Sequence, residues 1–156
     1  MTQDAFWSAA WAEALRACIN CGRAPEERAQ IRRPEAYWQA IDRGRQTFGG
    51  SLVLGIRDVP RGQSAYLTLA FDGGACTAAR LGAQSDGAEP RYVLAGTQAD
   101  WQAMARDGNL LRGIMYGTLR LDAGDPIAFF KDICFFLEVL ACLARVPTTF
   151  ADGAAA

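Results

Sequence analysis

The sequence predicts an α/β protein of the α+β type, in which helices accompany five strands. Two patterns carry this prediction. Between residues 50 and 122, short runs of alternating apolar and polar residues follow the two-residue period of strands, and turn residues separate the runs. Before and after this region, apolar residues recur every three or four positions, as on the face of a helix. We therefore expect a helical N-terminal part, 1–49, followed by a part, 50–146, that holds the sheet and the C-terminal helices.

The composition favours one folded domain, expected to span 1–156. With 156 residues, of which 51% are hydrophobic, the chain can bury a sizeable core without disulfides or a metal. The net charge of -1 argues against a nucleic-acid partner, which would call for a basic surface. Histidine is absent, which excludes Ser-His-Asp and Cys-His catalysis and any zinc site with histidine ligands.

The N-terminal part opens with an amphipathic helix. Asp4 or Ser8 is its expected cap, Trp7 belongs to its apolar face, and Gly22 is a plausible stop. Next comes the polar segment 23–45, in which Pro25 and Pro34 are each placed to open a short helix. This segment is rich in arginine, and we interpret it as a solvated surface rather than as an anion-binding site.

The strands are separated by turn and helix signals. Asp72-Gly73-Gly74 supplies the positive φ angles of a tight hairpin, so the first three strands should form an antiparallel meander. Thr97 and Asp100 resemble a capping box that starts a helix, and a short helix, Leu110–Tyr116, follows that one. The expected strands are Ser51–Asp58, Ala65–Asp72, Ala75–Leu81, Arg91–Thr97 and Thr118–Asp122.

The last helix, expected to run from Pro126 to Arg145, is apolar on two sides. Lys131, Glu138 and Arg145 recur every seven residues and define one narrow polar stripe. The apolar surface is about twice as wide as the 100° stripe of an ordinary surface helix, so one face of a sheet cannot be its only partner. A ligand, a second subunit or more of the same core can cover the other side. The charges inside the helix argue against stable membrane insertion.

The five cysteines and the absence of a leader-like N-terminus favour reduced thiols and a cytoplasmic location. Cys18 and Cys21 have the spacing of a metal or redox motif, but no further CxxC or histidine completes a zinc site. We interpret the pair as a structural accident, with an adventitious disulfide or oxidation site as the next alternative. No nucleophile has a plausible activating base, so we expect neither catalysis nor a metal or other cofactor.

From Arg91 onward, a series of motifs occurs in a recognisable order. It comprises Tyr92-Val93-Leu94-Ala95-Gly96-Thr97, Ala99-Asp100-Trp101, Asp107-Gly108-Asn109-Leu110, Gly117-Thr118-Leu119-Arg120-Leu121 and Gly124-Asp125. This order resembles the sterol carrier protein 2 (SCP2) family, in which a strand, a tryptophan-bearing helix, a short helix, a strand and an apolar final helix follow one another. The resemblance covers residues 50–146 well and 1–49 loosely. Thr118 replaces the lysine usual in the family, and the segment from Gly108 to Gly117 is about two residues short.

The resemblance implies a mixed five-stranded sheet covered by helices, with an apolar tunnel for fatty acyl chains, sterols or isoprenoid-like molecules. The expected function is non-catalytic binding or transfer of such a lipid. The alternative is an accessory or dimerisation module that uses the apolar C-terminal helix as its interface with a second copy or an enzyme partner. The expected tunnel lining is Trp101, Met104, Leu111, Ile114, Met115, Phe129, Phe130, Ile133, Phe136, Leu137 and Leu140.

Overall fold

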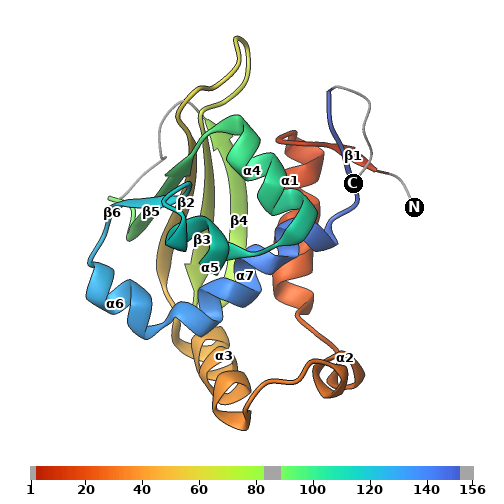
Figure 1. Ribbon diagram of the computed structural model, residues 1–156, viewed down its shortest axis with the longest axis vertical. Helices are drawn as coiled ribbons and strands as arrows, with labels where there is room; N and C mark the ends of the chain where they lie inside the picture. The colour runs from red at the N-terminus through yellow and green to blue at the C-terminus, as the bar shows by residue number, and fades with distance from the viewer. Residues whose placement is uncertain (1–2, 83–88, 152–156) are drawn as a thin grey trace.

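The computed structural model describes residues 3–82 and 89–151, and a five-stranded sheet forms its centre (Figure 1). The strand order is β4-β3-β2-β5-β6. The neighbours β2 and β5 are parallel and the other pairs are antiparallel, so the sheet is mixed, as the resemblance implies. The strands are β2 (Gly50–Ile56), β3 (Tyr66–Asp72), β4 (Ala75–Gly82), β5 (Tyr92–Gly96) and β6 (Arg120–Ala123).

Helices cover one face of this sheet, with α1, α4 and α7 lying together in front of the strands in Figure 1. The strand residues predicted to face inward, including Leu52, Leu67 and Leu94, are fully buried, but Val53 between two of the inward residues of β2 is buried as well. Helices α2 and α3 extend below the sheet. The helices are α1 (Ala9–Cys21), α2 (Pro25–Gln30), α3 (Glu35–Thr47), α4 (Gln98–Asp107), α5 (Leu110–Met115), α6 (Pro126–Lys131) and α7 (Ile133–Arg145).

The local start and stop signals act largely as expected. The side chain of Ser8 caps α1, and Gly22 ends that helix with a positive φ. Thr97 and Asp100 form a complete capping box at α4. Asp125 accepts a hydrogen bond from the backbone of Ile127 at the start of α6. These caps are predictable because each satisfies backbone N–H groups within three residues of itself.

The two ends of the chain pair with each other, which the sequence did not indicate. Asp4 is not a helix cap but belongs to β1 (Asp4–Ala5), which lies parallel to β7 (Thr148–Thr149). Trp7 is also outside the helix, with a φ of 62°, and its indole N–H donates to the carbonyl of Ser64. The strained backbone of Trp7 is held by this bond and by burial of the ring.

The expected final helix is two helices. Asp132, with φ -101° and ψ 19°, ends α6 and starts α7. Figure 1 shows α6 below the edge strand β6 and α7 crossing in front of the sheet. Because neither proline nor glycine marks the break, it follows from packing and not from a local signal.

The second apolar side of α7 is covered by the chain itself. Helices α1, α3 and α4 pack against α7, and Phe135, Phe136 and Leu140 are buried. Close approach of α3 requires glycine at position 44, where a Cβ would lie 2.6 Å from the ring of Phe135. Among the three alternatives for covering this helix, the structure thus favours more of the same core along α7.

The last strand is shifted relative to the prediction. It begins at Arg120 and not at Thr118. The backbone N–H groups of Thr118 and Leu119 both donate to the carbonyl of Gly113, which ties these residues back to α5. Thr118 and Leu119 therefore complete the end of the short helix and do not pair with β5.

Candidate functional site

The residues expected to line a tunnel fall into three groups in the structure. The first group packs inside the aromatic and aliphatic core, the second is partly buried, and the third is exposed. The chain therefore brings only part of the set together. The buried group is Trp101, Met104, Phe129, Phe136 and Leu140; the partly buried group is Ile114, Ile133 and Leu137; the exposed group is Leu111, Met115 and Phe130.

An aromatic layer fills the space between the sheet and the helices α6 and α7. The rings of Phe129 and Phe136 stack with centroids 4.6 Å apart, and Tyr92 of β5 meets Phe129 at 5.2 Å and Phe136 at 5.4 Å. Phe48 closes the layer at 5.2 Å from Phe136. These contacts belong to a packed core, so a ligand can enter this layer only if side chains or helices move.

Trp101 is fixed in the core by its polar edge. Its indole N–H donates to the carbonyl of Gly55 over 2.8 Å, and its ring lies 6.4 Å from that of Trp7. A buried tryptophan whose N–H is satisfied is a structural anchor, because a new orientation of the ring would leave that donor without a partner.

A groove of about 320 Å³ lies between α4 and α5. Met104 and Leu119 supply its apolar surface, and Leu119 was not among the expected lining residues. Gly113 is required here, since a Cβ at this position would lie 2.8 Å from the side chain of Leu119. The lining residues are Asp100, Ala103, Met104, Asp107, Asn109, Arg112, Gly113, Tyr116, Thr118 and Leu119.

The polar groups of this groove are largely engaged within the chain. The carboxylate of Asp100 accepts from the Thr97 backbone and hydroxyl, and the Asn109 side chain accepts from the backbone N–H of Arg112. Arg112 also pairs with Asp107 at 3.7 Å. The groove therefore offers an apolar floor under a rim of polar side chains that already have partners.

Exposed apolar side chains gather on the two short helices that flank β6 in the chain. Met115 on α5 is 81% exposed, Ile127 on α6 is 80% exposed and Phe130 is 47% exposed. Tyr116, which follows α5 and lines the groove, is also exposed. Together with Leu111 these residues form what we call the α5/α6 apolar set. A contiguous exposed apolar patch marks a surface that contacts a partner or ligand, whereas single exposed apolar side chains are common.

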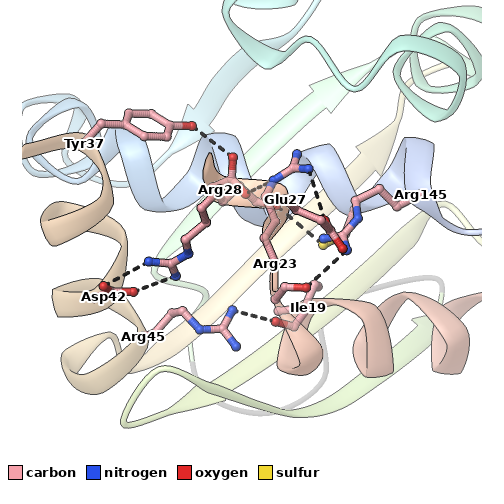
Figure 2. Close-up of polar contacts among 11 residues, drawn as sticks. Ile19, Arg23, Glu27, Arg28, Tyr37, Asp42, Arg45 and Arg145 are labelled. Carbon is pink, nitrogen blue, oxygen red and sulfur yellow. Dashed lines mark hydrogen bonds and ion pairs between the residues drawn. The ribbon is translucent and has the colours of Figure 1, made fainter. Parts of the chain in front are cut away.

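Charged residues attach the helices α2 and α3 to α7 (Figure 2). Arg23 donates from Nε to Oε2 of Glu138 over 2.7 Å, and the hydroxyl of Tyr37 donates to Oε1 over 3.0 Å. Arg28 pairs with Asp42 at 2.7 Å. The interpretation of the arginine-rich segment 23–45 as a solvated surface is therefore wrong for Arg23, which is 19% exposed and holds the carboxylate of the expected polar stripe.

The charged neighbours also shift the pKa values of Tyr37 and Asp42. Burial and the adjacent Glu138 carboxylate raise the pKa of Tyr37 above its ordinary value. The Arg28 guanidinium lowers the pKa of Asp42.

Within residues 3–82 and 89–151, no group of three or more acidic or cysteine side chains is placed to hold a metal ion. Over the same residues, no helix is both long and apolar enough to cross a bilayer.

Comparison with solved structures identifies the fold. No protein-family model matches the chain, and no curated protein sequence matches it. The crystal structure of sterol carrier protein 2 superposes with a TM-score of 0.64 and 26% identity, over 90% of this chain and 98% of that one. The solution structure of a conserved hypothetical protein from Thermus thermophilus gives a TM-score of 0.60 and 24% identity, over 94% and 93%. The chain has the fold of sterol carrier protein 2, as its motif order predicts.

Proposed function

We propose that this chain binds and carries an apolar molecule, such as a fatty acyl, sterol-like or isoprenoid lipid, without transforming it. The observation that supports this most is the likeness to sterol carrier protein 2 over 98% of that chain at 26% identity. The name of that protein describes a carrier of sterols. The buried layer under α6 has the apolar chemistry that such a ligand requires, and α6 also carries the exposed apolar side chains of Ile127 and Phe130.

We place the ligand in the layer that Phe129 fills. Phe129 is the buried side chain of α6, and Leu110 is the large buried side chain of α5. Helices with few buried side chains open at the lowest free energy. Outward movement of α6 would withdraw Phe129 from Tyr92 and expose the apolar layer to a ligand.

The free energy of burial sets the kind of ligand. Each CH₂ group transferred from water contributes about 0.8 kcal/mol, so a chain of about 16 carbons gains roughly 12 kcal/mol. Association and ordering cost about 4–15 kcal/mol, before the repacking of Phe129 is counted. Affinity should therefore rise with the length of the chain, with little preference for the shape of the tail.

The first test is native mass spectrometry of freshly purified protein, with solvent extraction of whatever is bound. A lipid at near one molecule per chain supports the proposal. In parallel, saturated fatty acids of increasing length are added and the Tm is measured. An empty protein whose Tm responds to none of them contradicts lipid binding.

A matched pair of substitutions on α6 tests the location. Phe130→Glu places a charge beside the proposed entry, whereas Ile127→Glu places it on the more exposed side of the same helix. We expect Phe130→Glu to weaken long-chain binding by about tenfold, roughly 1.4 kcal/mol, and Ile127→Glu to leave it unchanged. Equal effects of the two substitutions would place the ligand elsewhere.

A second candidate is an accessory module that docks on a partner, favoured by the 80% exposure of Ile127 and 81% exposure of Met115. The interface would then involve α5 and α6, because the residues of α7 such as Phe136 are buried within the chain. Sedimentation over a concentration series tests whether the partner is a second copy. A dimer that Ile127→Glu dissociates, in a protein without lipid, favours this function over lipid binding.

A further inference from the structure

A small pocket lies at one end of the aromatic layer, where α3 approaches the junction of α6 and α7. It has a volume of about 100 Å³, and Phe48 and Phe135 form its apolar wall. The ring centroids of these two residues are 5.3 Å apart, and that of Phe48 lies 5.2 Å from that of Phe136. Figure 1 shows α3 and α6 at the lower end of the sheet. The pocket therefore borders the layer in which we place the ligand.

The polar wall of this pocket is cationic. It is lined by Arg43 of α3, by Lys131 at the end of α6 and by Arg91 immediately before β5. Asp132 is the one carboxylate among its lining residues. Over residues 3–82 and 89–151, the ion pairs of the structure involve none of these three cations. The pocket therefore carries an excess of positive charge.

Arg91 is held at the boundary between the pocket and the aromatic layer. Its Nη1 donates to the carbonyl of Gly49 over 2.7 Å. Its guanidinium carbon lies 5.1 Å from the ring centroid of Phe48 and 5.7 Å from that of Tyr92. A guanidinium has five N–H donors, so the bond to Gly49 leaves others for a ligand. Arg91 thus presents a positive charge and hydrogen-bond donors at the edge of the layer.

We propose that this pocket binds the anionic headgroup of the ligand, a carboxylate or a phosphate, while the tail enters the aromatic layer. The inference rests on the proposed function and narrows the ligand to an acidic amphiphile, in place of a neutral sterol or alcohol. A water molecule takes about 30 Å³ of the liquid, so a pocket of about 100 Å³ admits a headgroup of a few heavy atoms but not an alkyl tail. Guanidinium and ammonium groups bind such anions through charge-assisted hydrogen bonds.

Lys131 connects this pocket to the entry of the tail. It is the last residue of α6, the helix whose outward movement would expose the apolar layer. An anion that contacts both Lys131 and Arg43 would tie α6 to α3 once the tail is in place. The headgroup would therefore stabilise the loaded state as well as select the ligand.

The size of the selectivity follows from the exposure of the three cations. All three side chains are exposed, and each exposed ion pair contributes only about 0.2–1 kcal/mol. Together they should favour an acid over an alcohol of equal length by about tenfold, with each cation responsible for about threefold. The preference should fall as salt is added, because salt screens exposed charges.

The test compares three ligands that share one tail, namely tetradecanoate, tetradecyl phosphate and tetradecanol. Their affinities for the full chain are measured by titration calorimetry at low and high salt, at a pH where the acid is ionised. We expect both anions to bind about tenfold more tightly than the alcohol at low salt. Equal affinities of all three would overturn this inference and leave lipid binding intact, whereas binding of none would overturn both.

Variants locate the headgroup. Lys131→Gln and Arg43→Gln should each lower the ratio of the acid affinity to the alcohol affinity by about threefold. Asp132→Asn should raise that ratio, because it removes the carboxylate that repels the ligand. Arg32→Gln, an exposed arginine outside the pocket, is the matched control and should keep the ratio. A preference for the acid that Lys131→Gln and Arg43→Gln both leave unchanged would place the headgroup elsewhere and overturn the inference.

A free anion is distinguished from a headgroup by its missing tail. Acetate and inorganic phosphate are titrated under the same conditions, and we expect them to bind far more weakly than tetradecanoate and tetradecyl phosphate. Inorganic phosphate that binds as tightly as tetradecyl phosphate would show a site for free anions and would contradict the link between the pocket and the apolar layer.

Discussion

The hydroxyl of Tyr37 on α3 donates a hydrogen bond of 3.0 Å to Glu138 on α7, across 101 residues of sequence. Arg23 binds the other oxygen of the same carboxylate, 115 residues away in sequence. Glu138 is otherwise placed among apolar residues of α7, and its side chain is 16% exposed. The folded state tolerates a carboxylate in this position only because Arg23 and Tyr37 bind it. Without them, the carboxylate would carry the full penalty of desolvation. These two bonds to Glu138 therefore hold α3, and the residue that precedes α2, against α7.

Replacement of the partners of Glu138 should reveal this dependence. We expect Arg23→Ala to lower the free energy of unfolding by about 1–3 kcal/mol, because it leaves a half-satisfied carboxylate in a largely buried position. The measurement is urea unfolding at neutral pH. Arg32→Ala, at an exposed position in the same segment, is the control and should change stability by less than about 0.5 kcal/mol. Equal losses in the two variants would contradict a specific role for Glu138.

The pairing of the chain ends depends on one hydroxyl. Thr148 is buried, accepts the indole N–H of Trp11 over 2.9 Å and donates to the carbonyl of Val146 over 2.7 Å. Thr148→Val keeps the volume but leaves the Trp11 donor buried without a partner, so we expect a loss of about 1–3 kcal/mol in thermal or urea unfolding. Thr149→Val, at the next position of β7, is the matched control. A neutral Thr148→Val would mean that water replaces the hydroxyl.

Two neighbouring phenylalanines of the expected tunnel lining should differ in stability. Phe136 is fully buried and stacks on Phe129, whereas Phe130 is 47% exposed. Phe136→Ala should lower the free energy of unfolding by about 3–5 kcal/mol, as in other packed cores. Phe130→Ala should lose less than about 1 kcal/mol, as expected of a residue that leaves no core cavity. Comparable losses would show that α6 is held more firmly than its single buried side chain indicates.

The reactivity of Cys18 should follow its acidity. The nearby Cys142 thiol, and then Arg145 and Arg23, lower the pKa of Cys18 to about 7. Since the thiolate is the nucleophile, alkylation of Cys18 by iodoacetamide should reach half its maximal rate near pH 7 and fall as the pH is lowered further. Cys142→Ala removes the largest of the lowering effects, so the midpoint should move to higher pH. Rates are read from peptide mass spectrometry at a series of pH values.

An unchanged midpoint in Cys142→Ala would show that the arginines alone control the acidity of Cys18. Cys142→Ser is the matched control, because its hydroxyl can still donate a hydrogen bond to the thiolate. That variant should keep a midpoint near that of the unmodified chain.

Much of the fold is predictable from short-range information. Ser8, Thr97 and Asp125 act as caps because their side chains bond to N–H groups within three residues of themselves. The alternation of Leu52 and Leu54 places one side of β2 inward whatever strand lies beside it. The order and type of the elements, and hence the likeness to sterol carrier protein 2, follow from signals of this kind.

The candidate site is less predictable, because exposure depends on partners far along the chain. Met115 and Phe129 are both large apolar residues at helical positions, yet Met115 is 81% exposed and Phe129 is fully buried. Nothing in the neighbouring sequence distinguishes them. Similarly, Asp132 has no proline or glycine beside it to announce the break between α6 and α7.

The sequence by itself determined the class of fold, the caps and the inward face of each strand, since these depend on the period of side chains and on hydrogen bonds between near neighbours. Only the tertiary structure decided that Glu138 binds Arg23 and Tyr37. Such contacts form when α1, α3 and α7 pack together. They depend on the positions of whole helices in space, which the spacing of residues along one segment does not specify.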